Sequence, residues 1–508
     1  MESFIGFIAE GQTVADLKAT VANRSEYASI YPDSIHQVDQ TVLFMMKGEH
    51  VKKLCIVGDS SPIFSEIAGE IVNTIPGPKV KVADLSVENS KVIRKYFDFA
   101  NPKAMSGAAA TIGLGDRLGL ASPGHIRLIK QTKMHPILAQ QSIRELNLTG
   151  RNYAGVMADA VWAVFQEDYR GGFGADGDHL KTPAEVGMAL DNGYTMITLD
   201  CSEHINNVSV NDKTAIDQIL AKIDPAQIKK LEQTFLGHEI KLQTGLALAF
   251  TPEKLKLNIA VYQQAVNFAI QIYSEFLKPL AGKVDFEVSI DETMTPTDPA
   301  SHYFVAEQLT AAAVKINSMA PRFCGEFQKG IDYIGDLKQF AREYGEHDKI
   351  ARHYGYKLSI HSGSDKFSVF PTIGKVSEGY IHVKTAGTNW LEAVRVIIRT
   401  DPALYREMHK FALENLMEAK KYYHITADMN RVPNIDTLSD AQLADLMNQN
   451  DARQLIHIAY GLILTAKDKA GNSRFRDRIY SCLYQNEELY YEMLQNHIGK
   501  HIKLLGLM

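Results

Sequence analysis

Cysteine and tryptophan are both scarce in this sequence. The chain has 508 residues, of which four are cysteines and two are tryptophans. The cysteines lie far apart and show neither CxxC spacing nor the spacing of a zinc knuckle; they are Cys55, Cys201, Cys324 and Cys482. We therefore expect reduced thiols and a cytoplasmic protein, because stable disulfides are typical of secreted domains.

Basic tracts and long apolar runs are absent as well. The 54 basic and 60 acidic residues give a net charge of -6, so we expect no nucleic-acid partner. No run of 18 apolar residues occurs, and the first residues lack a basic leader, so we expect neither a membrane partner nor a secretion signal. The remaining composition is typical of a globular chain with two or three domains, or one large barrel with additions.

Short apolar segments recur from residue 108 onward, and each is followed by polar residues and then by a helical pattern. This alternation predicts right-handed βαβ units, and eight strands predict a closed (β/α)₈ barrel of the TIM type. The predicted strands are 109–113, 172–176, 195–200, 284–291, 314–318, 356–361, 379–384 and 423–428.

The pattern divides the chain into three parts. We expect an N-terminal α/β cap over 1–105 and the barrel over 106–432, with an insertion at about 201–283. Residues 433–508 show only helical patterns and predict a C-terminal helical extension. We expect this extension to pack against the barrel; a contact within a homo-oligomer is the alternative.

The sharpest local motif is GADGDHLK, residues 174–181. Active sites of (β/α)₈ barrels lie at the carboxyl ends of the strands, and here Asp178 directly precedes His179. A general acid or base beside a metal ligand would explain this pair. The alternative is a turn in which Asp176 and Asp178 cap backbone amides.

A second motif, KLSIHSGSDKFSVFP, places His361 at the end of an apolar strand. Two imidazoles that converge with a carboxylate suit Zn, Ni, Mn, Co or Fe, so His179 and His361 are candidate ligands of a divalent metal. Glu326, after the fifth predicted strand, is our first choice for a third ligand. The alternatives are Gln328, His382 and Asp176.

Glu287 lies in a predicted strand between apolar neighbours. Burial inside a barrel would raise its pKa and suit it to donate a proton. The alternative is a structural ion pair with Lys315 or Lys283.

Other polar side chains follow the predicted strands and are candidates for binding an anionic substrate, although each could also be an ordinary surface residue. They are Asp116, Arg117, Lys181, Arg322, Ser364, Asp365, Lys366, His382 and Lys384. The Gly-Leu-Gly at 113–115 is too short for a dinucleotide loop, so we expect no nicotinamide cofactor.

Six spaced motifs together resemble the tagaturonate/fructuronate epimerase family of bacterial hexuronate catabolism, over about residues 50–430. They are GLGDRLGLASPGHIRLIK (113–130), GADGDHLKTPAEV (174–186), FEVSIDETMTPTDPASHY (286–303), PRFCGEFQKGIDYIGD (321–336), KLSIHSGSDKFSVFP (357–371) and HVKTAGTNWLEAVR (382–395).

The resemblance implies a metal-dependent isomerase that interconverts D-tagaturonate and D-fructuronate, two 5-keto sugar acids that differ at carbon 3. Since carbon 3 is β to the ketone, simple enolisation cannot invert it. A retro-aldol route can, because the bond to carbon 4 breaks and re-forms on the other face of the aldehyde, while a metal stabilises the enediolate.

The segments GDH (177–179) and SIHSG (359–363) are also similar to the site motifs of class II aldolases. This likeness implies that Asp178 accepts a proton, that Glu287 donates one, and that His179, His361 and Glu326 bind the metal. The alternatives are a class II aldolase acting on a keto-sugar or its phosphate, an epimerase of the corresponding neutral ketoses, and a non-catalytic sugar-acid-binding protein.

Overall fold

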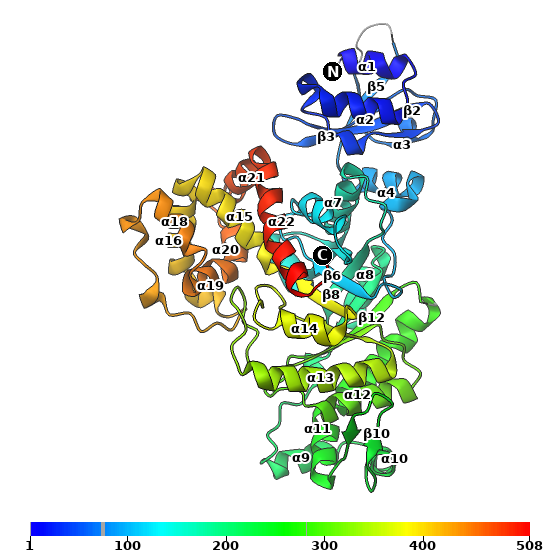
Figure 1. The fold of residues 1–508 in the computed structure, drawn as a ribbon, viewed down its shortest axis with the longest axis vertical. Coiled ribbons are helices and arrows are strands. Elements are labelled where there is room, and N and C mark those ends of the chain that lie inside the picture. The colour runs from blue at the N-terminus through cyan, green and yellow to red at the C-terminus, as the bar shows by residue number, and fades with distance from the viewer. Residues whose placement is uncertain (1, 73–76, 281) are drawn as a thin grey trace.

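The computed structural model describes residues 2–72, 77–280 and 282–508. It begins with a small antiparallel sheet of order β1-β2-β3-β5-β4, set apart at one end of the molecule (Figure 1). Its strands are β1 (His36–Val38), β2 (Thr41–Lys47), β3 (Lys52–Val57), β4 (Glu70–Val72) and β5 (Val80–Asp84). The helices α1 (Glu2–Ala9) and α2 (Val14–Asn23) pack on one face of this sheet.

The centre of the molecule is a closed barrel of eight parallel strands, which confirms the predicted TIM-type fold. In barrel order from the first strand, they are β6 (Ala110–Leu114), β7 (His135–Ser142), β8 (Gly174–Leu180), β9 (Met196–Asp200), β12 (Asp285–Ile290), β13 (Ser318–Pro321), β14 (Lys357–Ile360) and β15 (Ile381–Thr385). Because the strands are parallel, their carboxyl ends meet at one rim of the barrel.

One strand predicted from the sequence is absent, one strand of the barrel was not predicted, and one is displaced. Residues 423–428 form no strand, although buried Tyr423 and Ile425 alternate there with exposed neighbours. The strand that sequence reasoning missed is β7, whose carboxyl half contains the buried polar residues Gln140 and Gln141. The segment predicted as 314–318 is displaced, since β13 covers Ser318–Pro321.

Helices surround the barrel and lie in the chain between its successive strands or after the last one. They are α5 (Ser122–Ile129), α6 (Ile143–Thr149), α7 (Tyr153–Gln166), α8 (Pro183–Asp191), α11 (Pro252–Ile272), α12 (Pro299–Ala311), α13 (Leu337–Tyr354), α14 (Phe370–Ser377) and α15 (Gly387–Thr400). Local capping fixes where they start: Thr182 and Glu185 form a capping box at α8.

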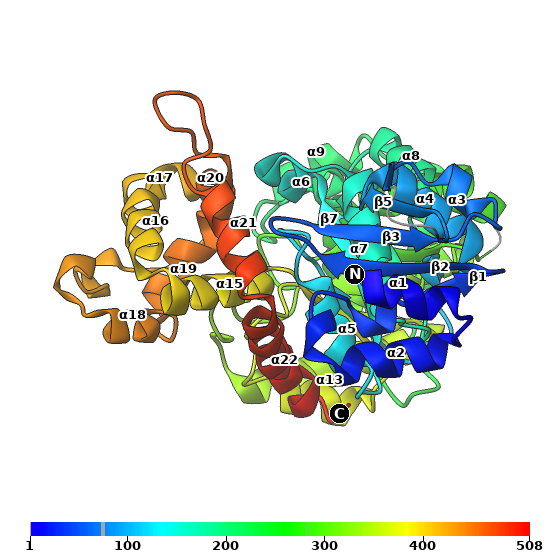
Figure 2. The ribbon, with the colours of Figure 1, turned by 90° about the horizontal axis from the view of Figure 1, so that it is seen from above.

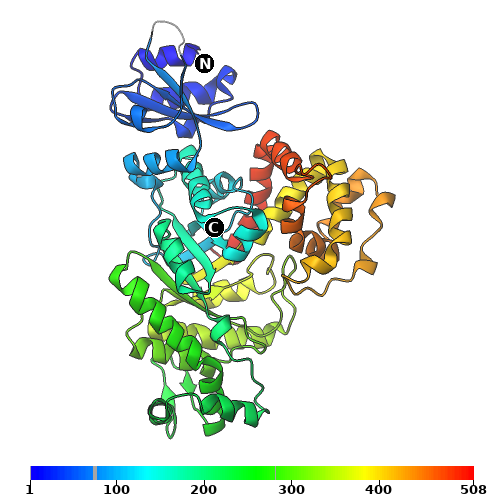
Figure 3. The ribbon, with the colours of Figure 1, turned by 180° about the vertical axis from the view of Figure 1, so that it is seen from behind.

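The connection from β9 to β12 is the longest of the crossovers and lies at the opposite end of the molecule from the N-terminal sheet (Figures 1 and 3). Besides α11 it contains α9 (Lys213–Leu220), α10 (Pro225–Phe235) and the hairpin of β10 (Ile240–Lys241) and β11 (Ala247–Leu248). It is the segment in which the sequence predicts an insertion.

After the barrel the chain builds a helical lobe beside it, with a second hydrophobic core around Trp390 and Tyr460. Its helices are α16 (Pro402–Glu414), α17 (Leu416–Ala419), α18 (Asp440–Leu446), α19 (Asn450–Ile458), α20 (Tyr460–Thr465) and α21 (Arg476–Gln485). The last helix, α22 (Glu487–Leu504), returns to the barrel and packs against α5 and α15 (Figure 2). Within the described ranges, no helix is both long and apolar enough to cross a membrane.

Candidate active site

A pocket of about 570 Å³ opens at the carboxyl ends of the barrel strands. Asp178 and His179 from β8, His361 after β14 and Lys384 from β15 all line it. Tyr423 and His457 of the helical lobe close its far side. A wider cavity of about 1110 Å³ adjoins the pocket and shares several lining residues with it, among them His179 and His361.

Asp178 and His179 both reach this pocket although they are neighbours in one strand. Successive side chains of a regular strand point to opposite faces. The pairing of β8 with β9 shifts its register between Gly177 and Leu180, and His179 has the unusual backbone angle φ of 54°. An irregularity of this kind re-aims side chains next to active sites, which explains how the pair can share one site.

Lys384 is the centre of a buried cluster of charges. Its Nζ lies 2.8 Å from Asp176 Oδ2, 2.7 Å from Asp178 Oδ1 and 3.0 Å from Glu287 Oε1. It also donates a hydrogen bond to the Thr198 hydroxyl. Burial alone would lower the pKa of Lys384, but the three carboxylates outweigh burial and hold the pKa well above its usual value.

The three carboxyl groups differ in their pKa values. Burial raises the pKa of Asp176 to about 6, against the opposing effect of Lys384. For Asp178, burial is outweighed by Lys384 and the two imidazoles, and its pKa lies below the usual range.

Glu287 contradicts the expectation of a raised pKa. Burial favours its protonated form, but Lys384 and the hydrogen-bonded His361 outweigh burial and hold the pKa well below its usual value. The side chain is 0% exposed and is absent from the described lining of the pocket; Ser318 also donates a hydrogen bond to it. Glu287 is therefore an ionised group beneath the pocket floor.

The rings of His179 and His361 meet edge to face, with their centroids 4.8 Å apart and an angle of 76° between their planes. His361 Nε2 lies 2.7 Å from Glu287 Oε1, and its Nδ1 lies 3.3 Å from Asp291 Oδ2. His179 Nδ1 lies 3.6 Å from Asp200 Oδ2. Burial would lower the pKa of His361, but Asp291 and Glu287 raise it to about 10.

This donor set fits a divalent metal. The Nδ1 atoms of both rings are buried and face the Asp291 and Asp200 carboxylates, but among the described residues neither makes a well-aligned hydrogen bond. Ligand atoms of His179, Asp200 and Glu292 lie within 4.8 Å of one another. Imidazole nitrogens that face carboxylate oxygens are the ligands that zinc and related ions prefer.

Of the residues predicted as third ligands, Glu326 and Gln328 line the wider cavity together with His179 and His361, but they are outside the group formed by His179, Asp200 and Glu292. The Gln328 amide oxygen already accepts hydrogen bonds from Thr426. His382 is buried and bonded to the Thr111 hydroxyl through Nδ1.

Of the nine side chains predicted to bind substrate, Arg117, Ser364 and Lys384 line the pocket, and Arg322 lines the wider cavity. The others make contacts within the fold. The Asp116 carboxylate accepts hydrogen bonds from four backbone amides at the start of α5, Lys181 contacts Ser202 and Asp200, and Lys366 donates to three carbonyl groups.

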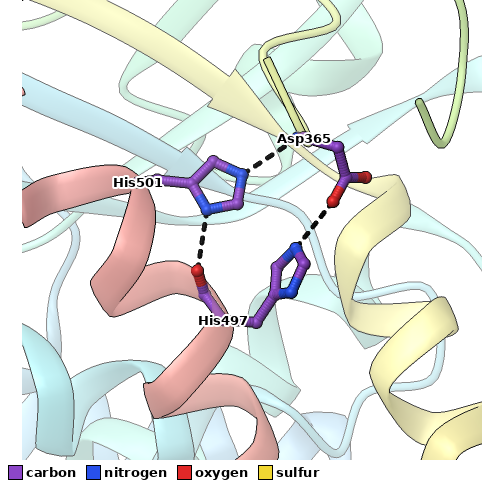
Figure 4. Close-up of side chains that lie close together, drawn as sticks. All are labelled: Asp365, His497 and His501. Atoms are coloured by element: carbon purple, nitrogen blue, oxygen red, sulfur yellow. Dashed lines mark hydrogen bonds and ion pairs between the residues drawn. The ribbon is translucent and has the colours of Figure 1, made fainter. Parts of the chain in front are cut away.

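Asp365, also predicted to bind substrate, instead joins the loop after β14 to the last helix (Figure 4). Its Oδ1 lies 2.7 Å from His497 Nε2 and 2.9 Å from Arg453 Nη2. Its backbone amide donates to His501 Nε2 at 3.0 Å, and His501 Nδ1 donates to the His497 carbonyl. Although these side chains have metal-like spacing, both ring nitrogens of His501 are occupied, so the cluster fastens α22 to the barrel.

Sequence reasoning missed several residues of the pocket, among them Gln140, Arg144, Lys329 and His457. Gln140 and Arg144 lie in or just after β7, so recognising that strand would have placed both at the rim. Lys329 follows the candidate ligands Glu326 and Gln328 in the same loop. His457 comes from α19, and no local motif marks it.

A closed (β/α)₈ barrel whose strand ends bring acids, imidazoles and a buried lysine into one pocket defines an enzyme. The comparisons identify which kind. The family model described as tagaturonate epimerase matches residues 31–505, so the chain belongs to the tagaturonate epimerase family and is an isomerase.

Individual relatives agree with this assignment. The chain is 40% identical to the tagaturonate/fructuronate epimerase of Thermotoga maritima over 487 residues, which is 94% of this chain and 96% of that protein. It is 47% identical to the fructuronate-tagaturonate epimerase of Cohnella laeviribosi. The native crystal structure of that enzyme has a TM-score of 0.90, covering 97% of this chain and 99% of that one. Its complex with one glycerol has a TM-score of 0.91, covering 96% and 99%.

Proposed function

We propose that this protein interconverts D-tagaturonate and D-fructuronate by retro-aldol cleavage and aldol re-formation at carbon 3, with a divalent metal. The observation that carries the proposal is the ionised Asp178 carboxylate, 2.7 Å from the Lys384 ammonium and beside two imidazoles whose Nδ1 atoms face carboxylates. Family membership supports the choice of substrate.

His179 and His361 would hold the metal, together with carboxylates from Asp200, Asp291 and Glu292. Glu326, in the adjoining cavity, is the second choice for an oxygen ligand. When bound, the ion supplies positive charge that stabilises the oxyanion of the cleaved substrate. Glu287, which is not one of these ligands, contacts His361 Nε2 at 2.7 Å and keeps that ring oriented toward this position.

Asp178 is the base that takes the proton of the carbon-3 hydroxyl, since it is ionised and lines the pocket. The Lys384 ammonium contacts both Asp178 and Glu287, so it can give a proton to the new alkoxide and take back the proton that Asp178 holds, which restores both groups. Glu287 acts through Lys384 and His361, since it lies beneath the pocket floor.

The four cysteines are buried and unpaired in the described structure. Free buried thiols are typical of a reducing compartment, so we infer that the enzyme works in the cytoplasm.

The test is to strip the purified enzyme with a chelator and then to add Zn, Ni, Mn, Co or Fe before supplying D-tagaturonate. We expect no turnover after stripping, and D-fructuronate after reloading with at least one of these ions. Release of free three-carbon products in stoichiometric yield would show an aldolase instead. Full activity in the stripped, metal-free protein would refute the role of the metal.

A further inference from the structure

Part of the pocket lining is basic, and we call this part its basic side. Arg117, Arg144 and Lys329 all line it, and His457 lies with them. One acid on this side, Glu145, pairs with Arg117 at 2.7 Å. The basic side therefore combines three cations with one carboxylate, which is already paired.

Two of these cations have no ion-pair partner within the described ranges. Arg144 packs over the Tyr423 ring, with 4.9 Å between its Cζ and the ring centroid. Lys329 Nζ donates a hydrogen bond to the Ser362 hydroxyl at 2.8 Å. Burial lowers the pKa of Lys329, and the neighbouring Arg144 and Arg117 lower it further. A bound anion would relieve this repulsion.

Unpartnered polar atoms on the same side also point to a ligand. Arg117 is 2% exposed, and its Nη1 is buried with no hydrogen-bond partner among the described residues. The same holds for both ring nitrogens of His457. A Cβ placed on Gly387 would lie 2.0 Å from the His457 ring, so this glycine lets the ring sit against the backbone. Buried polar atoms normally have partners, and orphaned ones are typical of a site that binds something.

We propose that the basic side binds the carboxylate of the sugar acid and holds the cleaved fragment while its aldehyde group rotates. The residues that bind it are Arg117, Arg144, Lys329 and His457. This inference rests on the proposed function and adds the residues that make the enzyme specific for an acid. Lys384 cannot serve in their place, because its charge is committed to Asp176, Asp178 and Glu287.

The chemistry requires such an anchor. When the hydroxyl proton of carbon 3 passes to Asp178, the electron pair of the bond between carbons 3 and 4 moves into the enediolate of carbons 4 to 6. Carbons 1 to 3 then form a separate three-carbon aldehyde acid. Rotation about the bond between carbons 2 and 3 presents the other face, the bond re-forms, and the proton returns to the carbon-3 oxygen.

During that rotation, the carboxylate is the charged group by which the protein can grip the three-carbon fragment. The carboxylate carbon is two bonds from carbon 3, so its binding site must share a pocket with Asp178, as the basic side does. Charge-assisted contacts from guanidinium and ammonium groups are among the strongest that proteins make to carboxylates. Retention of this fragment is what separates an epimerase from an aldolase built on the same groups.

The test compares Arg144→Met and Lys329→Met, singly and together, with the parent enzyme in its metal-loaded form. Arg431→Met is the matched control, since Arg431 is an exposed cation of the helical lobe that pairs with Asp428. The substrates are D-tagaturonate and the neutral ketose D-tagatose, and released aldehyde acid is trapped with phenylhydrazine and identified by mass.

We expect KM for the uronate to rise at least about tenfold in each single variant and further in the double variant. The amount of trapped three-carbon aldehyde acid should also rise in these variants. Their kcat/KM for the neutral ketose should stay within about threefold of the parent. Arg144 is exposed, so its variant remains usable if Lys329→Met folds poorly.

An unchanged uronate KM and no trapped fragment in the double variant would overturn the anchor while leaving the epimerase function intact. Equal losses of kcat/KM for the uronate and for the neutral ketose would overturn the anchor as well, since they would show a general structural effect. A parent enzyme that does not interconvert the uronates would overturn both proposals.

Discussion

Lys384 is the residue on which the charge balance of the site depends. Three carboxylates lie within 3.0 Å of its ammonium group, and all of them are buried. Without this cation, two or more of them would have to take up protons, because like charges so close together in a buried site cannot all stay ionised. The lysine therefore keeps Asp178 in the form that accepts a proton.

Lys384→Met should lower kcat by about 10²- to 10⁴-fold, the usual contribution of a positioned acid or base. The measurement is steady-state epimerisation of D-tagaturonate by the metal-loaded variant, with thermal unfolding followed in parallel. The matched control is Lys357→Met, which removes another buried barrel lysine, one that donates to the Ala108 carbonyl and does not line the described pocket. It should reduce stability and leave kcat within about threefold of the parent. A Lys384→Met enzyme with near-parental kcat would contradict the role of Lys384 in returning the proton to the substrate.

At the scale of elements, the alternation of strands and helices was enough to predict the barrel, because a parallel strand buried on both faces reads as a short apolar run. The exception is instructive. Strand β7 carries buried glutamines at its carboxyl end, where it approaches the pocket, and this polar half breaks the apolar pattern. The segment 423–428 imitates a strand because Tyr423 and Ile425 anchor an irregular chain to the lobe core.

Residues of the candidate site could likewise be predicted only where a local pattern marks the end of a strand. The ends of β8, β14 and β15 could be located from their motifs. The structure brings Asp178, His361 and Lys384, which lie at these ends, into one pocket. Arg144 depended on the missed strand, and His457 comes from a helix far along the chain, which no local pattern connects to a strand end.

The last helix, α22, supports the loop after β14 that carries His361. Removing the His501 ring nitrogen would leave the buried Asp365 amide without its acceptor, a loss worth roughly 1–3 kcal/mol. His501→Phe should therefore speed hydrogen exchange over residues 361–369 and lower kcat about tenfold. The matched control is His409→Phe, at a buried histidine in α16 whose Nδ1 contacts the Tyr405 hydroxyl. Unchanged exchange and kcat in His501→Phe would mean that the contact only adds stability.

At the scale of the whole molecule, the N-terminal sheet is joined to the last helix by two ion pairs that share the buried Glu487. Glu487, at the start of α22, lies 3.0 Å from both Lys47 and Lys52. The Tyr31 hydroxyl donates to it at 2.8 Å. Residues more than 430 positions apart in the chain thus hold the two ends of the protein together, beside a cleft lined by both parts.

Glu487→Gln should destabilise the protein by roughly 1.5–3 kcal/mol at pH 7, the usual value of hydrogen bonds to a charged group. Burial would raise the pKa of Glu487, but Lys52, with help from Tyr31 and Lys47, lowers it below its usual range. The stabilisation is therefore complete above the unfolded-state pKa of about 4.3 and is lost as the pH falls through the lower folded-state value. Urea unfolding of both proteins between pH 3 and pH 8 should show a gap in free energy that is constant above about pH 5 and narrows in acid. A gap of the same size at every pH would show that the glutamate contributes shape and packing, and that its charge does not join the two ends of the chain.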